Sequence, residues 1–186
     1  MRKAILVMYV VGAVTAVGCS GGSLRHDHAA GATEQTRSSG STPPSAMRSP
    51  IDRDTARLRA ATAAFRSLDA AVAAGYSPSG GSCISHPTQG AMGFHHNNAK
   101  LTDDRVELER PEVLVYQRTP SGEYALTGVE YFVPFSARPR DAEPPTIMGQ
   151  QLKPFDQGKF WYLHAWVFLE NPAGLFADWN PKVSCS

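Results

Sequence analysis

The first periodic segment of the chain has the spacing of an amphipathic helix. Larger apolar side chains recur every three or four residues over positions 54–74: Leu58, Ala61, Phe65, Leu68 and Val72. Side chains at this spacing share one face of an α-helix. Asp52 or Asp54 can cap the start, and Gly75 is typical of a glycine-terminated end. The pattern therefore predicts one helix over residues 54–74.

Beyond Met92 the apolar positions alternate in short runs that proline or glycine separates, as in β-strands. The predicted strands cover residues 112–116, 124–127, 128–133 and 160–169, with a hairpin turn at 119–122 and a long loop over 137–154. The last strand is apolar on both sides, so we expect it to lie centrally and to be covered on both faces. The order of elements predicts an α+β fold, in which one N-terminal amphipathic helix packs on a curved antiparallel sheet or partly closed barrel.

The first residues have the organisation of an export signal. Arg2 and Lys3 precede an uncharged apolar run, and small residues stand directly before Cys19. About 13 apolar residues span only about 20 Å as a helix, too short for a hydrocarbon core of roughly 30 Å. The junction resembles the lipobox of bacterial lipoproteins, which implies cleavage before Cys19 and a diacylglycerol with acyl chains such as palmitate on its thiol. The alternative is an ordinary secretory signal cleaved near Ala16.

Composition divides the rest of the chain. Residues 20–50 are rich in Ser, Gly, Thr, Pro and Ala, and cannot bury enough apolar surface to fold. We therefore expect a signal peptide over 1–18, a lipidated Cys19 with a disordered tether over 19–50, and a single domain over 51–186. The predicted location is extracytoplasmic, with the lipid on Cys19 inserted in the cell membrane, or in an outer membrane if the cell has one.

Charge and cysteine content narrow the partners. The chain carries 18 Lys and Arg against 17 Asp and Glu without a basic stripe, so nucleic acid is not an expected partner. The oligomeric state is left open. Apart from Cys19 the cysteines are Cys83 and Cys185, and in an exported protein such a pair usually forms a disulfide. A thiolate metal site or redox pair is the weaker alternative, because the two do not form a CxxC motif.

Ionisable residues interrupt the apolar strands, where an unpaired buried charge or imidazole is costly. They are His164, Glu130, Glu112 and one of the adjacent pair His95 and His96, whose side chains alternation sends to opposite faces. If these strands are neighbours, imidazoles and carboxylates converge on one face. Such a set suits a divalent metal, with zinc as the first choice, and three ligands leave a position open for water or substrate.

This set of residues permits several functions. The leading hypothesis is a metal site made by His95, Glu112, Glu130 and His164, with His96 as the secondary choice. A polar small molecule could instead bind without metal in an aromatic pocket, or Glu130 and His164 could simply pair within the core. The site could also belong to an enzyme that activates water or holds a substrate, with Glu112 as fourth ligand or general base. No GxSxG or SxxK motif supports a serine hydrolase.

Five blocks of the domain resemble a family of exported bacterial proteins to which no activity is assigned. The blocks are residues 92–95 (MGFH), 110–116 (RPEVLVY), 128–134 (GVEYFVP), 163–166 (LHAW) and 171–181 (NPAGLFADWNP). The resemblance implies a shared fold and site but no reaction. In that family the position matching His95 is histidine and the next is often tyrosine, so the resemblance favours His95 over His96.

Overall fold

A computed structural model describes residues 49–79 and 83–185 of the chain. The predicted signal peptide, Cys19 and nearly all of the predicted tether lie outside the described residues. Within the part that is described, no helix is long and apolar enough to cross a membrane.

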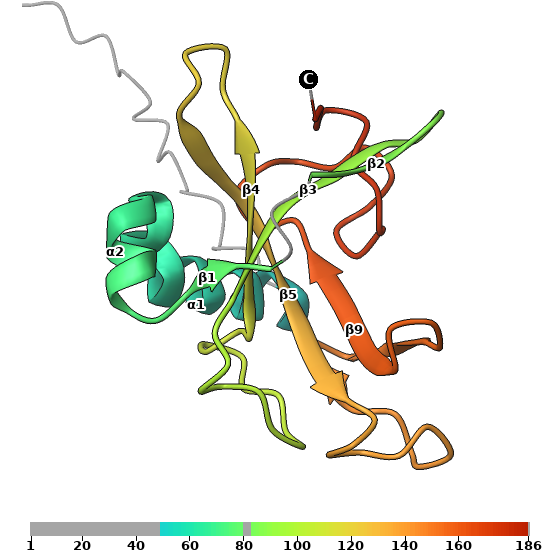
Figure 1. Ribbon diagram of the computed structural model, residues 1–186. Helices are drawn as coiled ribbons and strands as arrows, with labels where there is room; N and C mark the ends of the chain where they lie inside the picture. The colour runs from blue at the N-terminus through green and yellow to red at the C-terminus, as the bar shows by residue number, and fades with distance from the viewer. Residues whose placement is uncertain (1–48, 80–82, 186) are drawn as a thin grey trace, which may run out of the picture. The chain divides into compact units, whose positions relative to one another are not determined.

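An antiparallel sheet of seven strands dominates the structure (Figure 1). Its strands are β1 (Ser77–Pro78), β2 (Ile84–His86), β3 (Gly90–Asn97), β4 (Val113–Arg118), β5 (Tyr124–Pro134), β8 (Lys153–Phe155) and β9 (Phe160–Ala165). The order is β1-β3-β4-β5-β9-β8, and β2 also pairs with β3. The short strands β6 (Thr146–Ile147) and β7 (Gln150–Gln151) form a separate pair. The outermost strands β1 and β8 do not pair with each other, so the sheet is open.

The helical region is broken into short pieces. Helix α1 (Pro50–Thr62) is followed by the 3-10 helix η1 (Ala63–Arg66) and by α2 (Leu68–Ala73). Ser49 begins α1 through a capping box with Asp52. Ser67 is extended, and its hydroxyl accepts a hydrogen bond from the Ala70 amide, so it caps α2 as a new helix.

The predicted α+β fold is therefore wrong in two respects. The single helix expected over 54–74 does not form, because Ser67 ends one helical segment and starts another. The barrel does not close, because β1 has two residues and β8 has three, which leaves little backbone for further pairing. The described chain is mostly an open antiparallel sheet with short helical segments.

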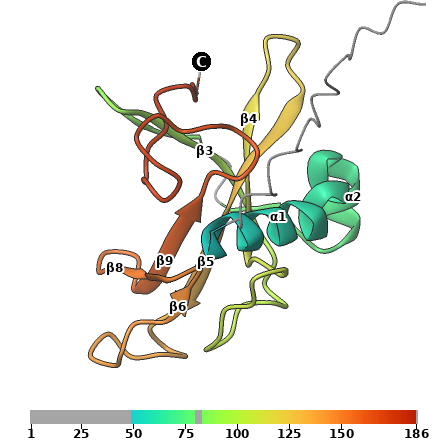
Figure 2. The same ribbon diagram turned by 180° about the vertical axis from the view of Figure 1, so that it is seen from behind.

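Alternate residues of the central strands form the core on one face of the sheet. Leu114 pairs with Val129 and Tyr131 with Leu163, and all four are buried. Leu58 of α1 is fully buried in the same cluster. Figure 2 shows α1 on the side of the sheet that faces the viewer.

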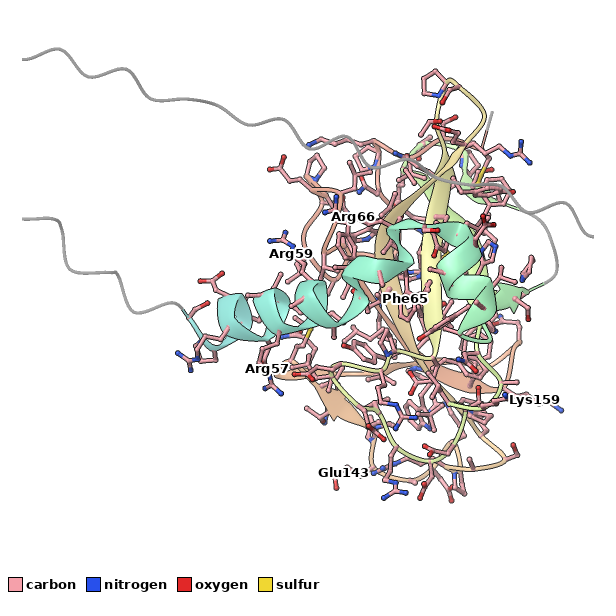
Figure 3. All side chains as sticks on the ribbon, turned by 90° about the vertical axis from the view of Figure 1, so that its left-hand side faces the viewer. Arg57, Arg59, Phe65, Arg66, Glu143 and Lys159 are labelled. Atoms are coloured by element: carbon pink, nitrogen blue, oxygen red, sulfur yellow. A yellow bond between two sulfur atoms is a disulfide. The ribbon has the colours of Figure 1, made fainter. Side chains whose placement is uncertain are left out.

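Polar contacts fasten the helical segments to the end of the sheet. The Tyr116 hydroxyl donates to the Phe65 carbonyl at 2.7 Å. Figure 3 shows Arg59 and Arg66 on the same side of the helical segments. Arg59 donates to the Val167 carbonyl, and the Arg66 guanidinium lies 5.0 Å from the ring centre of Phe168. These contacts connect the helical region to β4 and to the chain just after β9.

Several strand boundaries differ from the predicted ones. The segments expected at 124–127 and 128–133 form one strand, β5, with an irregularity beside Gly128: Val115 and Tyr116 of β4 pair with Gly128 and Leu126, so Thr127 is the extra residue. The strand expected over 160–169 ends at Ala165 and lies next to the edge strand β8 rather than at the centre. Strands β1 and β2 lie before Met92, in a part of the chain where no strand was predicted.

The predicted disulfide between Cys83 and Cys185 is confirmed. It connects the start of β2 to the end of the chain, across 102 positions. Asn180 and Ala91 also exchange backbone hydrogen bonds at 3.1 and 3.2 Å, so the C-terminal segment is fixed against β3 at two places.

Candidate metal centre

The face of the sheet opposite the core carries the candidate site. Glu130 of β5 pairs directly with His164 of β9, so their side chains project on the same face. His95 of β3 shares that face through its pairing with Val115 and the pairing of Val115 with Gly128. Alternation along three strands therefore brings the three polar side chains to one side.

Two strands separate the histidines. In a flat sheet β3 and β9 would lie about 14 Å apart, since neighbouring strands are about 4.8 Å apart. The Nε2 atoms of His95 and His164 nevertheless lie only 3.2 Å apart, which requires the sheet to curl toward this face. Gly128, which lies between them, has no side chain, and a Cβ atom there would approach the Ala165 carbonyl oxygen to 2.6 Å.

The three potential ligand atoms form a compact triangle. Glu130 Oε2 lies 3.4 Å from His95 Nε2 and 3.7 Å from His164 Nε2. The side chains are 10% exposed for His95 and Glu130 and 2% for His164. Histidine nitrogen and carboxylate oxygen are ligands for divalent metals, so the cluster of His95, Glu130 and His164 could hold a metal ion.

Burial makes the cluster electrically neutral. It lowers the pKa of His95 to about 4 and that of His164 well below its usual value. Burial also raises the pKa of Glu130 to about 8, and Asp178 and Glu112 add to this while Lys153 opposes it. At neutral pH the imidazoles are uncharged and Glu130 is mostly protonated, so the short contacts between them are not ion pairs.

The outer nitrogens of the two rings are also buried. Within the described residues, Nδ1 of His95 and Nδ1 of His164 have no partner at hydrogen-bonding geometry. A backbone group of Gly93 partly opposes the lowering of the His95 pKa, and one of Asp178 partly opposes that of the His164 pKa. A ligating histidine commonly turns its second N–H toward a backbone carbonyl.

A half-open pocket of about 370 Å³ lies directly against the three residues. Its wall is largely apolar and includes Ile84, Phe132, Phe155, Phe160, Tyr162 and Trp179. At one side of the pocket the Tyr162 hydroxyl donates to Asp178 at 3.3 Å, and Asp178 also contacts the Lys153 ammonium. Because the pocket adjoins the cluster, a metal held there would face space that a water or small molecule can enter.

Glu112 does not join the other predicted ligands. It precedes Val113, which shares the face of Glu130, so alternation turns Glu112 the other way. One of its carboxyl oxygens accepts a hydrogen bond from the Phe132 amide at 3.1 Å. Burial raises the pKa of Glu112 to about 8, and Asp103 and Glu107 contribute. This position removes the geometric basis for Glu112 as a fourth ligand or general base.

His96 likewise lies away from the cluster, on the opposite face from His95. It pairs with Leu114 and contacts the ring of Tyr116 edge-on, with ring centres 4.9 Å apart. Burial lowers the pKa of His96 below its usual value. Its position is that of a neutral core residue.

The pocket residues were missed as members of the site, although part of the signal was present. Phe160 and Tyr162 lie four and two residues before His164, and Phe132 lies two residues after Glu130, so each shares a sheet face with that polar residue. Ile84 and Trp179 reach the pocket from β2 and the C-terminal segment. No local spacing predicts that those two segments meet there.

Comparisons with protein families, with curated proteins and with solved structures find no match to this chain.

Proposed function

We propose that this protein binds one divalent metal ion, zinc in the first instance, through His95, Glu130 and His164. The observation that carries the proposal is the triangle of ligand atoms with edges of 3.2, 3.4 and 3.7 Å. Three residues from three strands direct their ligand atoms to one point beside an open pocket.

The size of the triangle favours a tetrahedral ion. Ligands about 2.0 to 2.1 Å from zinc at tetrahedral angles lie about 3.3 to 3.4 Å apart. Ligands at right angles around an octahedral ion, as in two-histidine, one-carboxylate iron sites, lie about 2.8 to 3.0 Å apart at similar bond lengths. The edges observed here match the tetrahedral case better. The fourth position would point into the pocket.

Metal analysis of the full-length protein tests this proposal. We expect about one zinc per chain after purification without chelator, and recovery of that stoichiometry when the stripped protein is titrated with Zn²⁺. Parallel titrations with Fe²⁺, Mn²⁺ and Ni²⁺ establish selectivity. A folded protein that contains no metal and shows no affinity for any of these ions would contradict the proposal.

The proposed place of action is the outer side of a bacterial membrane. Support comes from the order of charged, apolar and small residues before Cys19, followed by a tether-like composition up to position 50. A lipid on Cys19 would hold the metal site close to the membrane. The disulfide between Cys83 and Cys185 is compatible with an oxidising compartment.

Catalysis is a second candidate function, favoured by the pocket beside the open coordination position. Catalytic zinc sites use three protein ligands and lower the pKa of a bound water to about 7. Hydrolysis of 4-nitrophenyl esters by the zinc-loaded protein, lost in His164→Ala, would support it. If the zinc-loaded protein hydrolyses these esters no faster than Zn²⁺ in solution, catalysis is contradicted and metal binding remains the proposed function.

A further inference from the structure

We infer that the pocket beside the three residues binds a small aromatic carboxylate, whose carboxylate group completes the coordination of the metal. This inference rests on the proposed metal site and adds the chemical class of its ligand. It joins two features, the charge of the loaded site and the apolar wall of the pocket.

The charge of the loaded site favours a ligand with one negative charge. A divalent ion bound by two neutral histidines and an ionised Glu130 leaves a net charge of +1 in a buried setting. Among the described residues that line the pocket there is no Lys, Arg or Asp. The nearby Lys153 ammonium is already in contact with Asp178. A monoanion balances the site, whereas a second negative charge on the ligand would have no partner in the pocket.

The wall of the pocket favours an aromatic ring behind that charge. Aromatic side chains approach from β5, β8, β9 and the C-terminal segment, which allows edge and face contacts with a ring. About 370 Å³ is enough for one or two fused rings, and most small-molecule pockets are of this apolar kind.

Exposed apolar side chains at the pocket provide an independent observation. Three large apolar side chains among the described residues are notably exposed: Val72 at 54%, Ile84 at 46% and Phe155 at 42%. Two of the three, Ile84 and Phe155, stand at this pocket. A ring held in the pocket would cover apolar surface that otherwise meets water.

The few polar groups of the pocket limit what else the ligand can carry. Apart from the proposed metal ligands and the Tyr162 hydroxyl, which donates to Asp178, the polar side-chain groups of the described lining residues are those of Ser79 and Asn97 and the indole N–H of Trp179. The Ser79 hydroxyl is already bonded to the His95 carbonyl at 3.1 Å. A sugar or other ligand with many hydroxyl groups would leave most of them without partners.

Calorimetric titration of the zinc-loaded full-length protein tests the inference. The probes are acetate, benzoate and 2-naphthoate, which share the carboxylate and differ in apolar surface. We expect 2-naphthoate to bind at least 30-fold more tightly than acetate, with benzoate between them. Removal of zinc should weaken 2-naphthoate at least tenfold, because the carboxylate then loses its partner.

Two variants at exposed apolar residues test where the aromatic ring of the ligand binds. Phe155→Ser should weaken 2-naphthoate at least fivefold and leave the affinities for acetate and Zn²⁺ unchanged. Val72→Ser, which removes a comparably exposed apolar side chain on α2, should change none of the three. If zinc binds but 2-naphthoate binds no better than acetate, or binds equally without zinc, the ligand assignment is wrong and the metal site stands. If zinc does not bind at all, both proposals are wrong.

Discussion

His95 and His164 are 69 positions apart in the chain, yet their Nε2 atoms lie 3.2 Å from each other. Both rings are uncharged at neutral pH, because burial lowers both pKa values. Uncharged imidazoles are the form that binds metal, so no proton has to leave either ring before an ion enters. Only Glu130 must lose its proton on binding.

His95 and His96 provide a matched test of the metal site. His95→Ala removes one of three ligands, and we expect the affinity for Zn²⁺ to fall more than 100-fold, since loss of even an outer-shell partner can cost 10- to 100-fold. His96→Ala changes the adjacent residue on the other face and should retain about one zinc per chain. Metal content and affinity are measured on protein whose circular dichroism shows it to be folded. Equal zinc binding by the two variants would contradict the assignment.

Glu112 should make stability fall as pH rises. Its pKa is about 8 in the folded chain, against 4.5 for an ordinary glutamate, so the folded state holds its proton more tightly. The contribution is complete below pH 4.5 and is lost as pH rises toward 8, at up to about 1.4 kcal/mol per pH unit. Glu112→Gln should remove this slope and can still accept the hydrogen bond from the Phe132 amide.

Urea unfolding at pH 5, 6.5 and 8 in the presence of EDTA measures the Glu112 effect. The difference in unfolding free energy between wild type and Glu112→Gln should move in favour of the variant as pH rises. Glu123→Gln, at an exposed position of the β4–β5 turn, serves as the control and should follow wild type. Parallel curves for wild type and Glu112→Gln would show that Glu112 is not held protonated.

The disulfide should contribute strongly to stability. Cys83 and Cys185 are 102 positions apart, and chain-entropy arguments assign about 4 to 5 kcal/mol to a crosslink that closes so long a loop. The double variant Cys83→Ser, Cys185→Ser should lose about 2 to 5 kcal/mol in denaturant unfolding. Zinc stoichiometry should persist in the folded variant, because the three ligands lie on β3, β5 and β9. A loss of metal without a loss of stability would contradict this separation of roles.

Cys19 should determine membrane attachment. Full-length protein made in a bacterium fed with labelled palmitate should carry the label and enter the detergent phase on partitioning. Cys19→Ser should do neither, whereas Cys83→Ser should keep the label. Unlabelled wild-type protein with a new N-terminus near Val17 would instead identify an ordinary secretory signal.

Local alternation predicted much of the site but not all of it. It separated His95 from His96, and it set Glu130 and His164 inside apolar strands that prove to be direct neighbours. The same reasoning grouped Glu112 with them, because it too is an ionisable residue on a predicted apolar strand. The pairing of Val113 with Glu130 turns Glu112 to the other face, and strand register is not visible in one sequence.

The fold was predicted less well, for two physical reasons. The helical period of residues 54–74 is regular, but Ser67 can cap a new helix and interrupts the first. Sheet closure depends on the lengths of β1 and β8, whose few residues give no periodic signal. The pocket wall from Trp179 and Ile84 depends on contacts between distant segments, which spacing cannot reveal.

The disulfide between Cys83 and Cys185 also makes assembly of the pocket depend on the redox environment of the chain. Cys83 directly precedes Ile84, and Cys185 ends the segment that carries Trp179, so the bond secures two sides of the pocket. Thiols stay reduced in most bacterial cytosols and oxidise after export. In an exported chain, the two segments that carry Ile84 and Trp179 would therefore lack their crosslink inside the cell and gain it only after export.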